Sequence, residues 1–130
     1  MTAQDNAQLI RRGYEAFDKG DIPAVVAIFD DDISWHIPGR SPLAGDYSGP
    51  EGVLGFFGQL QERSGGSFRL ELHDLLASDD HVVALATEMG TRGDKSLSAQ
   101  TVHVWHVREG KATEFWGLAA DTYALDEFWS

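Results

Sequence analysis

The sequence contains no cysteine, which excludes disulfide bonds, thiolate nucleophiles and metal sites built on cysteine. Its apolar runs are short, and none approaches the ~18 residues of a membrane-spanning helix. The first residues have neither the basic start nor the apolar stretch of a secretory signal peptide. Together these absences favour a cytoplasmic protein.

Basic side chains are scarce, because 10 Lys and Arg stand against 21 Asp and Glu, for a formal net charge of −11. Such a surface repels the phosphate backbone of nucleic acids and the headgroups of anionic membranes. We therefore expect neither nucleic acid nor a membrane as partner. A small neutral molecule remains compatible with this charge.

The chain has 130 residues, of which 42% are hydrophobic, an ordinary share for a globular protein. Its length is near the modal size of one domain, and neither a repeat nor a linker interrupts it. We expect a single domain over residues 1–130.

The N-terminal third is predicted to be helical. Apolar residues spaced by three and four indicate a first helix, which Gly20 ends. Asp21 begins a second, short helix, and Ser48 begins a third over residues 50–63. The apolar face of the first helix is formed by Ala7, Ile10, Tyr14 and Phe17.

The remaining segments alternate apolar and polar residues with a period of two, as strands do. Three turns join the last four predicted strands, which predicts an antiparallel meander. The second of these turns is expected at residues 93–95. Residues 122–129 are expected to form a last half-turn or helix. The predicted strands are 32–38, 67–77, 81–92, 96–107 and 111–121.

Helices first and strands last predict an α+β fold, in which three N-terminal helices pack on one face of a curved antiparallel sheet. Two strands, "VVALAT" and "VHVWHV", carry apolar or aromatic residues on both faces. A sheet with one face in water alternates more cleanly. We therefore expect helices to cover one face and a partner to cover the other.

Four segments carry a family resemblance: "YEAFDKGDIPAVVAIFDDDISWHIPG", "LAGDYSGPEGVLGFF", "HDLLASDDHVVALAT" and "HVWHVREGKATEFW". In this order they resemble the nuclear transport factor 2-like superfamily, and more narrowly its SnoaL-like and ketosteroid-isomerase-like members. The resemblance implies a cone-shaped fold with a pocket between sheet and helices. It also implies a homodimer through the outer face of the sheet and a small hydrophobic molecule as ligand.

The same resemblance points to catalytic candidates. On the ketosteroid-isomerase pattern, His36 falls at or beside the catalytic base and His103 at the oxyanion donor, both of which are aspartates in that enzyme. The oxyanion-hole tyrosine of its first helix has its nearest match at Gly13, with Tyr14 one residue away. Histidines exchange protons near pH 7, so His36 and His103 are catalytic candidates. Tyr14 is the third candidate, because of its place beside the matched tyrosine position. The plain alternative is that both histidines are packed core residues.

Alternation extends the expected pocket from His103 to its neighbours on the strands. Glu88 would then face away, so that the strands would present no carboxylate to the pocket. For the phenylalanines, simple core packing is the better interpretation. The expected substrate-binding residues are Phe17, Phe56, Phe57, Leu85, Thr87, Met89, Thr101, Trp105 and Phe115.

The first functional hypothesis is a cofactor-free enzyme that uses acid/base chemistry to isomerise, dehydrate or cyclise a small hydrophobic carbonyl compound. The second is a non-catalytic module of the same fold, which binds an apolar metabolite or dimerises with another domain. A metal-dependent reaction would need a carboxylate that converges with His36 and His103, and we expect neither a metal nor a cofactor.

Trp35 and His36 lie on opposite faces of the first predicted strand, and a one-residue slip would exchange their faces. We expect His36 to face the cavity, with Trp35 packed behind it. If Trp35 lines the cavity instead, the hypothesis of a His36 base is excluded and the binding module takes its place.

Overall fold

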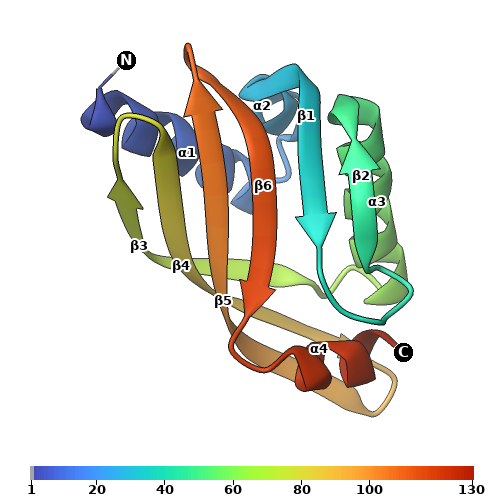
Figure 1. Cartoon of the computed structure of the whole chain (residues 1–130). Helices are drawn as coiled ribbons and strands as arrows, with labels where there is room; N and C mark the ends of the chain where they lie inside the picture. The colour runs from blue at the N-terminus through green and yellow to red at the C-terminus, as the bar shows by residue number, and fades with distance from the viewer. Residues whose placement is uncertain (1) are drawn as a thin grey trace.

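A computed structural model describes residues 2–130 (Figure 1). In these residues the structure confirms the predicted α+β class, with helices mostly early and strands mostly late in the chain. No helix of this part is long and apolar enough to cross a membrane. The helices are α1 (Ala3–Asp18), α2 (Ile22–Val26), α3 (Gly49–Arg63) and α4 (Thr122–Trp129). The strands are β1 (Phe29–Ile37), β2 (Gly45–Ser48), β3 (Arg69–Ala77), β4 (His81–Arg92), β5 (Lys95–Arg108) and β6 (Lys111–Ala119).

The strands form one sheet in the order β2-β1-β6-β5-β4-β3. The predicted antiparallel meander is present as β3 to β6. However, β1 runs parallel to β6, so the sheet is mixed and the expectation of a purely antiparallel sheet is wrong. A parallel pair needs a long connection, which α3 and the strands of the meander provide here.

Strand β2 is not among the strands that the sequence predicts. It is only four residues long, begins with Gly45 and has no run of alternating apolar residues. It becomes a strand because it pairs with the end of β1 at the edge of the sheet, with Trp35 opposite Tyr47 and His36 opposite Asp46. The pairing therefore depends on a partner strand and not on local sequence preference.

The predicted helix boundaries are largely confirmed. Gly20 adopts a φ of 72° after α1, a conformation that favours glycine. The Asp21 side chain accepts a hydrogen bond from the backbone N–H of Ala24 and so caps α2. Ser48 does precede α3, but its side chain makes no hydrogen bond to the helix.

Helices α1 and α3 lie on the same face of the sheet, with α1 against β3 and β4 and α3 against β1 and β2 (Figure 1). The hairpin of β4 and β5 extends beyond the rest of the sheet, and α4 packs on it. Arg92 and Lys95 of this hairpin donate hydrogen bonds to backbone carbonyls at the end of α4. The sheet, α1, α3 and α4 together enclose the space described next.

Candidate active site

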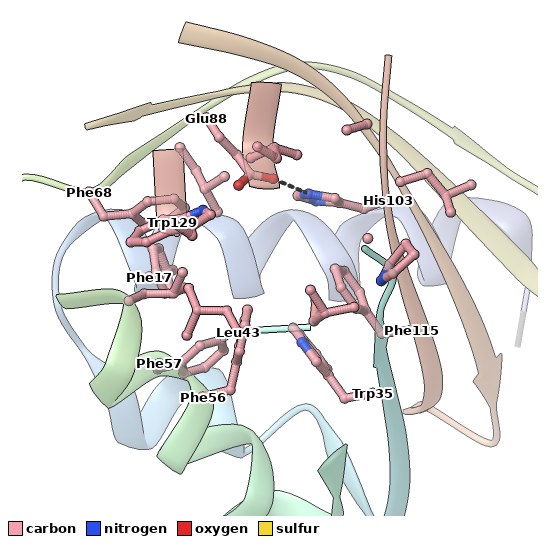
Figure 2. Close-up of a pocket in the computed structure, with 18 of the residues that line it drawn as sticks. Phe17, Trp35, Leu43, Phe56, Phe57, Phe68, Glu88, His103, Phe115 and Trp129 are labelled. Carbon is pink, nitrogen blue, oxygen red and sulfur yellow. Dashed lines mark hydrogen bonds and ion pairs between the residues drawn. The ribbon is translucent and has the colours of Figure 1, made fainter. Parts of the chain in front are cut away.

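A cavity lies between the sheet and the helices, and its wall is mostly apolar and rich in aromatic side chains (Figure 2). Water-sized molecules have about 100 Å³ of room in it, several times what one water needs. An apolar wall with few polar points is typical of sites for small organic ligands. The aromatic residues of the wall are Tyr14, Phe17, Trp35, Phe56, Phe57, Phe68, Trp105, Phe115 and Trp129.

Three polar side chains meet in this wall: Tyr14 from α1, His103 from β5 and Glu88 from β4. The Tyr14 hydroxyl lies 2.5 Å from Nδ1 of His103, and Nε2 of His103 lies 3.5 Å from Oε2 of Glu88. Behind Tyr14, Nε1 of Trp105 lies 3.1 Å from the hydroxyl oxygen. We call this chain of four residues, Trp105, Tyr14, His103 and Glu88, the polar relay.

The polar relay has a direction, because the indole N–H of Trp105 can only donate. The Tyr14 oxygen accepts from Trp105, and Nδ1 of His103 is in place to accept the proton of Tyr14. Nδ1 is then unprotonated, so His103 carries its proton on Nε2 and directs it toward Glu88. The relay thus ends in an N–H donor beside a carboxylate, which is a pair that can take and give a proton.

Burial keeps Tyr14 neutral. It raises the pKa of the hydroxyl well above its ordinary value of 10.0, and the charge of Glu88 acts in the same direction, while the hydrogen bond from Trp105 opposes both. Tyr14 is therefore a hydrogen-bond donor and not a base. The side chains of His103 and Glu88 are 5% and 16% exposed, so a hydrogen bond between them is stronger than it would be in water.

The structure places seven of the twelve predicted site residues in the cavity wall and leaves five outside it. Thr101 shares the face of His103, but its hydroxyl is buried and donates to the carbonyl oxygen of Ala86. The residues in the wall are Tyr14, Phe17, Phe56, Phe57, His103, Trp105 and Phe115. The residues outside it are His36, Leu85, Thr87, Met89 and Thr101.

The expectation that His36 faces the cavity is wrong. Trp35 lines the cavity, stacked on Phe115 with 3.7 Å between ring centroids, and His36 lies on the outer face of the sheet. There Nδ1 and Nε2 of His36 lie 2.7 Å from carboxylate oxygens of Asp46 and Glu114. The hydrogen bond to Asp46, followed by that to Glu114, raises the pKa of His36 above its ordinary 6.5, although burial acts the other way. A base role for His36 in the cavity is excluded.

The prediction for β4 is wrong by one residue. His103 pairs with Ala84 and not with Leu85, so the inward residues of β4 are the even-numbered ones, including Glu88. Leu85, Thr87 and Met89 therefore point away from the cavity. The missed carboxylate, Glu88, is the most important functional candidate that the sequence analysis overlooked.

The length of the turn between β4 and β5 decides whether Glu88 faces the cavity. The expected turn at 93–95 has three residues, but Arg92 pairs with Lys95, which leaves a two-residue loop of Gly93 and Asp94. Gly93 has a φ of 60°, as tight hairpin loops require. Counting back from a two-residue loop places Ala84 opposite His103, and Glu88 then falls on the cavity side.

Gly13 occupies the helix position that matches the oxyanion-hole tyrosine of the ketosteroid-isomerase pattern. A Cβ atom there would lie 2.6 Å from Cδ1 of Ile28, so a larger residue would require the end of the Ile28 side chain to move. The neighbouring Tyr14 reaches the cavity instead.

The rim of the cavity is formed by α4 and the loop after β1. Its residues are more exposed than the deep wall, and they include Ser41, Thr122, Leu125 and Asp126. Oδ1 of Asp126 accepts hydrogen bonds from the backbone N–H groups of Arg40 and Ser41, at 2.9 and 3.1 Å. This contact joins the loop to α4.

A family comparison agrees with this architecture. The model of the SnoaL-like domain matches residues 10–115, which is most of the chain. The chain belongs to the SnoaL-like domain family. The resemblance seen in the sequence is thereby confirmed, and the matched range includes every member of the polar relay.

Three relatives cover nearly all of this SnoaL-like chain. Bal32a, from a soil-derived mobile gene cassette, is 38% identical, with a TM-score of 0.95 and 98% of each chain covered. TerC, co-crystallised with polyporic acid, is 29% identical, with a TM-score of 0.84, and 95% of this chain and 97% of TerC are covered. An uncharacterised protein of Mycobacterium tuberculosis is 28% identical over the full length of both chains.

More distant structures share the fold alone. An LEH-like epoxide hydrolase of M. tuberculosis is 18% identical, with a TM-score of 0.77 over 98% of this chain and 90% of its own. A ketosteroid-isomerase candidate from Kribbella flavida is 19% identical, with a TM-score of 0.74 over 95% and 84%. A shared fold does not establish a shared reaction, so the reaction of this chain must be inferred from its site.

Within residues 2–130, no three His, Asp or Glu side chains are grouped so that they could hold a metal ion. The chemistry proposed below therefore uses only the side chains of the polar relay.

Proposed function

We propose that this protein is an enzyme that moves a proton between carbon atoms of a small hydrophobic carbonyl compound, with Glu88 as base. The observation that carries the proposal is the contact of 3.5 Å between Glu88 and the Nε2 of His103 inside an aromatic cavity. Groups that exchange protons are seldom buried together in a ligand-sized cavity for packing alone. The base is thus assigned to Glu88 in place of His36.

The reaction follows from the direction of the polar relay. The Glu88 carboxylate takes a proton from the carbon beside the carbonyl, and the electron pair of that C–H bond forms the enolate. Negative charge develops on the substrate oxygen, which replaces Glu88 as the acceptor of the hydrogen bond from Nε2–H of His103 once the substrate is bound. Glu88 then returns the proton to another carbon, which completes an isomerisation without gain or loss of electrons. Tyr14 and Trp105 hold His103 in the required tautomer.

The shape of the wall supports a flat, oxygenated, aromatic substrate. Nine aromatic side chains surround the cavity, and only a few polar groups reach it. TerC, whose chain is 29% identical, was crystallised with polyporic acid, a benzoquinone that carries two hydroxyl and two phenyl groups. We infer that this chain takes ligands of similar polarity and shape.

Exchange of carbon-bound protons tests the proposal without knowledge of the natural substrate. We expect the protein to accelerate the exchange of the α-protons of 2-tetralone, a bicyclic aromatic ketone, in D₂O, as followed by proton NMR. An increase of roughly 10²-fold over buffer would match the usual contribution of a positioned acid/base group. Binding of 2-tetralone without any acceleration would favour the non-catalytic binding module instead.

We also propose that two copies of the chain associate through the outer face of the sheet. This face carries exposed or half-buried apolar side chains on β4, β5 and β6, among them Leu85 and Leu118, which are 37% and 42% exposed. Identical faces of this kind can meet around a twofold axis. Association would bury this surface, which water would otherwise contact.

Sedimentation equilibrium tests this association. We expect the mass of two chains for the natural sequence and of one chain for Leu85→Glu at the same concentration, because the new carboxylate would be buried between the sheets. Tyr123→Glu, a matched change at an 88% exposed position of α4, is expected to leave the mass unchanged. A single-chain mass for the natural sequence would exclude the dimer.

A further inference from the structure

The indole nitrogen of Trp35 has no hydrogen-bond partner among residues 2–130, although it is buried. Trp35 is 4% exposed and lines the cavity. In Figure 2 its ring extends from β1 into the cavity, below Phe115 and opposite Leu43. The other tryptophan of the deep wall, Trp105, uses its indole N–H fully, in the hydrogen bond to Tyr14.

A buried N–H group without an acceptor is uncommon, because the group loses its hydrogen bond to water and gains nothing in return. The rings around Trp35 offer only the weak alternative of an N–H···π contact: Trp105 and Phe57 lie at 5.4 and 5.7 Å between centroids, nearly perpendicular to it. The packing of Trp35 therefore leaves a donor whose natural acceptor is not supplied by the described part of the chain.

We propose that the indole N–H of Trp35 binds an oxygen atom of the ligand. This inference rests on the proposed function, and it adds a second polar contact to the cavity, distinct from the polar relay. Because an indole N–H only donates, the group it recognises must be an acceptor, such as a carbonyl, an ether or a phenolate oxygen.

The position of Phe115 separates the two contacts. Its ring is stacked on Trp35 at 3.7 Å and lies 5.1 Å from the ring of His103, so it stands between them. A ligand that reaches both Trp35 and the Glu88–His103 pair must then carry oxygen atoms on opposite sides of a ring-sized apolar body. This requirement defines the ligand class as flat compounds with oxygen at both ends, to which hydroxyquinones belong.

Calorimetric titration with polyporic acid tests the donor. Trp35→Phe replaces the indole by a phenyl ring. The variant keeps an aromatic side chain at this position and loses the N–H donor, so it should fold. We expect its Kd for polyporic acid to rise about fivefold, within the range of one net hydrogen bond. Trp116→Phe, the same change on the outer face, is expected to bind like the natural sequence.

A second readout separates the donor from mere packing. In protein labelled with ¹⁵N-tryptophan, the indole proton signal that is missing in Trp35→Phe should move downfield when polyporic acid binds. An unchanged Kd in Trp35→Phe, or an unmoved signal, would overturn the inference and leave the exchange of 2-tetralone protons intact. Failure of the natural sequence to bind polyporic acid would also overturn it, whereas failure of the exchange assay alone would overturn only the proposed reaction.

Discussion

Glu88→Gln is expected to lower the rate of α-proton exchange in 2-tetralone by about 10²-fold, to near the rate in buffer, because the acceleration depends on the positioned base. Glutamine has nearly the shape of glutamate and can still accept the hydrogen bond from Nε2 of His103, but its amide does not take up a proton. The loss should therefore appear in kcat, with little change in KM.

Glu71→Gln is the matched control for this prediction. Glu71 lies on β3 with its side chain 64% exposed, and its Oε1 lies 3.9 Å from Nδ1 of His73. The same chemical change there should leave the exchange rate unaltered. If the two variants lost the same amount of activity, or neither lost any, Glu88 would not be the base.

Trp35→Ala is expected to lower the free energy of unfolding by about 3–5 kcal/mol, the range for removal of a buried tryptophan or phenylalanine. Trp35 is in contact with Phe29, Phe56 and Phe57, besides its stacking on Phe115. Its removal would leave a hole in the aromatic wall, which the rigid sheet cannot close. Unfolding in urea, with and without the substitution, measures the difference.

His36→Ala is the neighbouring comparison, and its effect should be small and dependent on pH. The pKa of His36 is raised in the folded state, so its ion pairs stabilise the fold fully below the unfolded value of about 6.5, and this contribution is lost as pH rises through the raised pKa. With 26% of its side chain exposed, His36 should contribute no more than about 1 kcal/mol at pH 6. The cost of Trp35→Ala should be nearly equal at pH 6 and pH 9, and a larger cost for His36→Ala would contradict the assigned faces.

The order of the elements could be predicted because each depends on local signals. The spacing of apolar residues located α1, Gly20 and Asp21 marked the break between helices, and alternation located the long strands. Edge pairing could not be predicted in this way. The four residues of β2 contain no pattern of their own, and the parallel contact of β1 with β6 joins segments far apart in the chain.

The face of each strand was harder to predict than its position, because a single residue of register decides it. On β1 the apolar set of Ile33, Trp35 and Ile37 was separated correctly from Ser34 and His36. The resemblance to the ketosteroid-isomerase pattern places Ser34 and His36 on the cavity side, but this match is ambiguous by one residue. The tendency of apolar side chains to be buried predicts the observed arrangement without an alignment, with Trp35 inside and His36 outside.

Nitrogen NMR of His103 in ¹⁵N-labelled protein at pH 9 tests the polar relay most directly. The donor-only N–H of Trp105 occupies one lone pair of the Tyr14 oxygen, and Nδ1 of His103 lies in place to accept the proton of the Tyr14 hydroxyl. The expected spectrum shows a proton on Nε2 and the chemical shift of an unprotonated nitrogen at Nδ1. A proton on Nδ1 together with an unprotonated Nε2 would contradict the relay, because His103 would then offer Glu88 and the substrate no N–H.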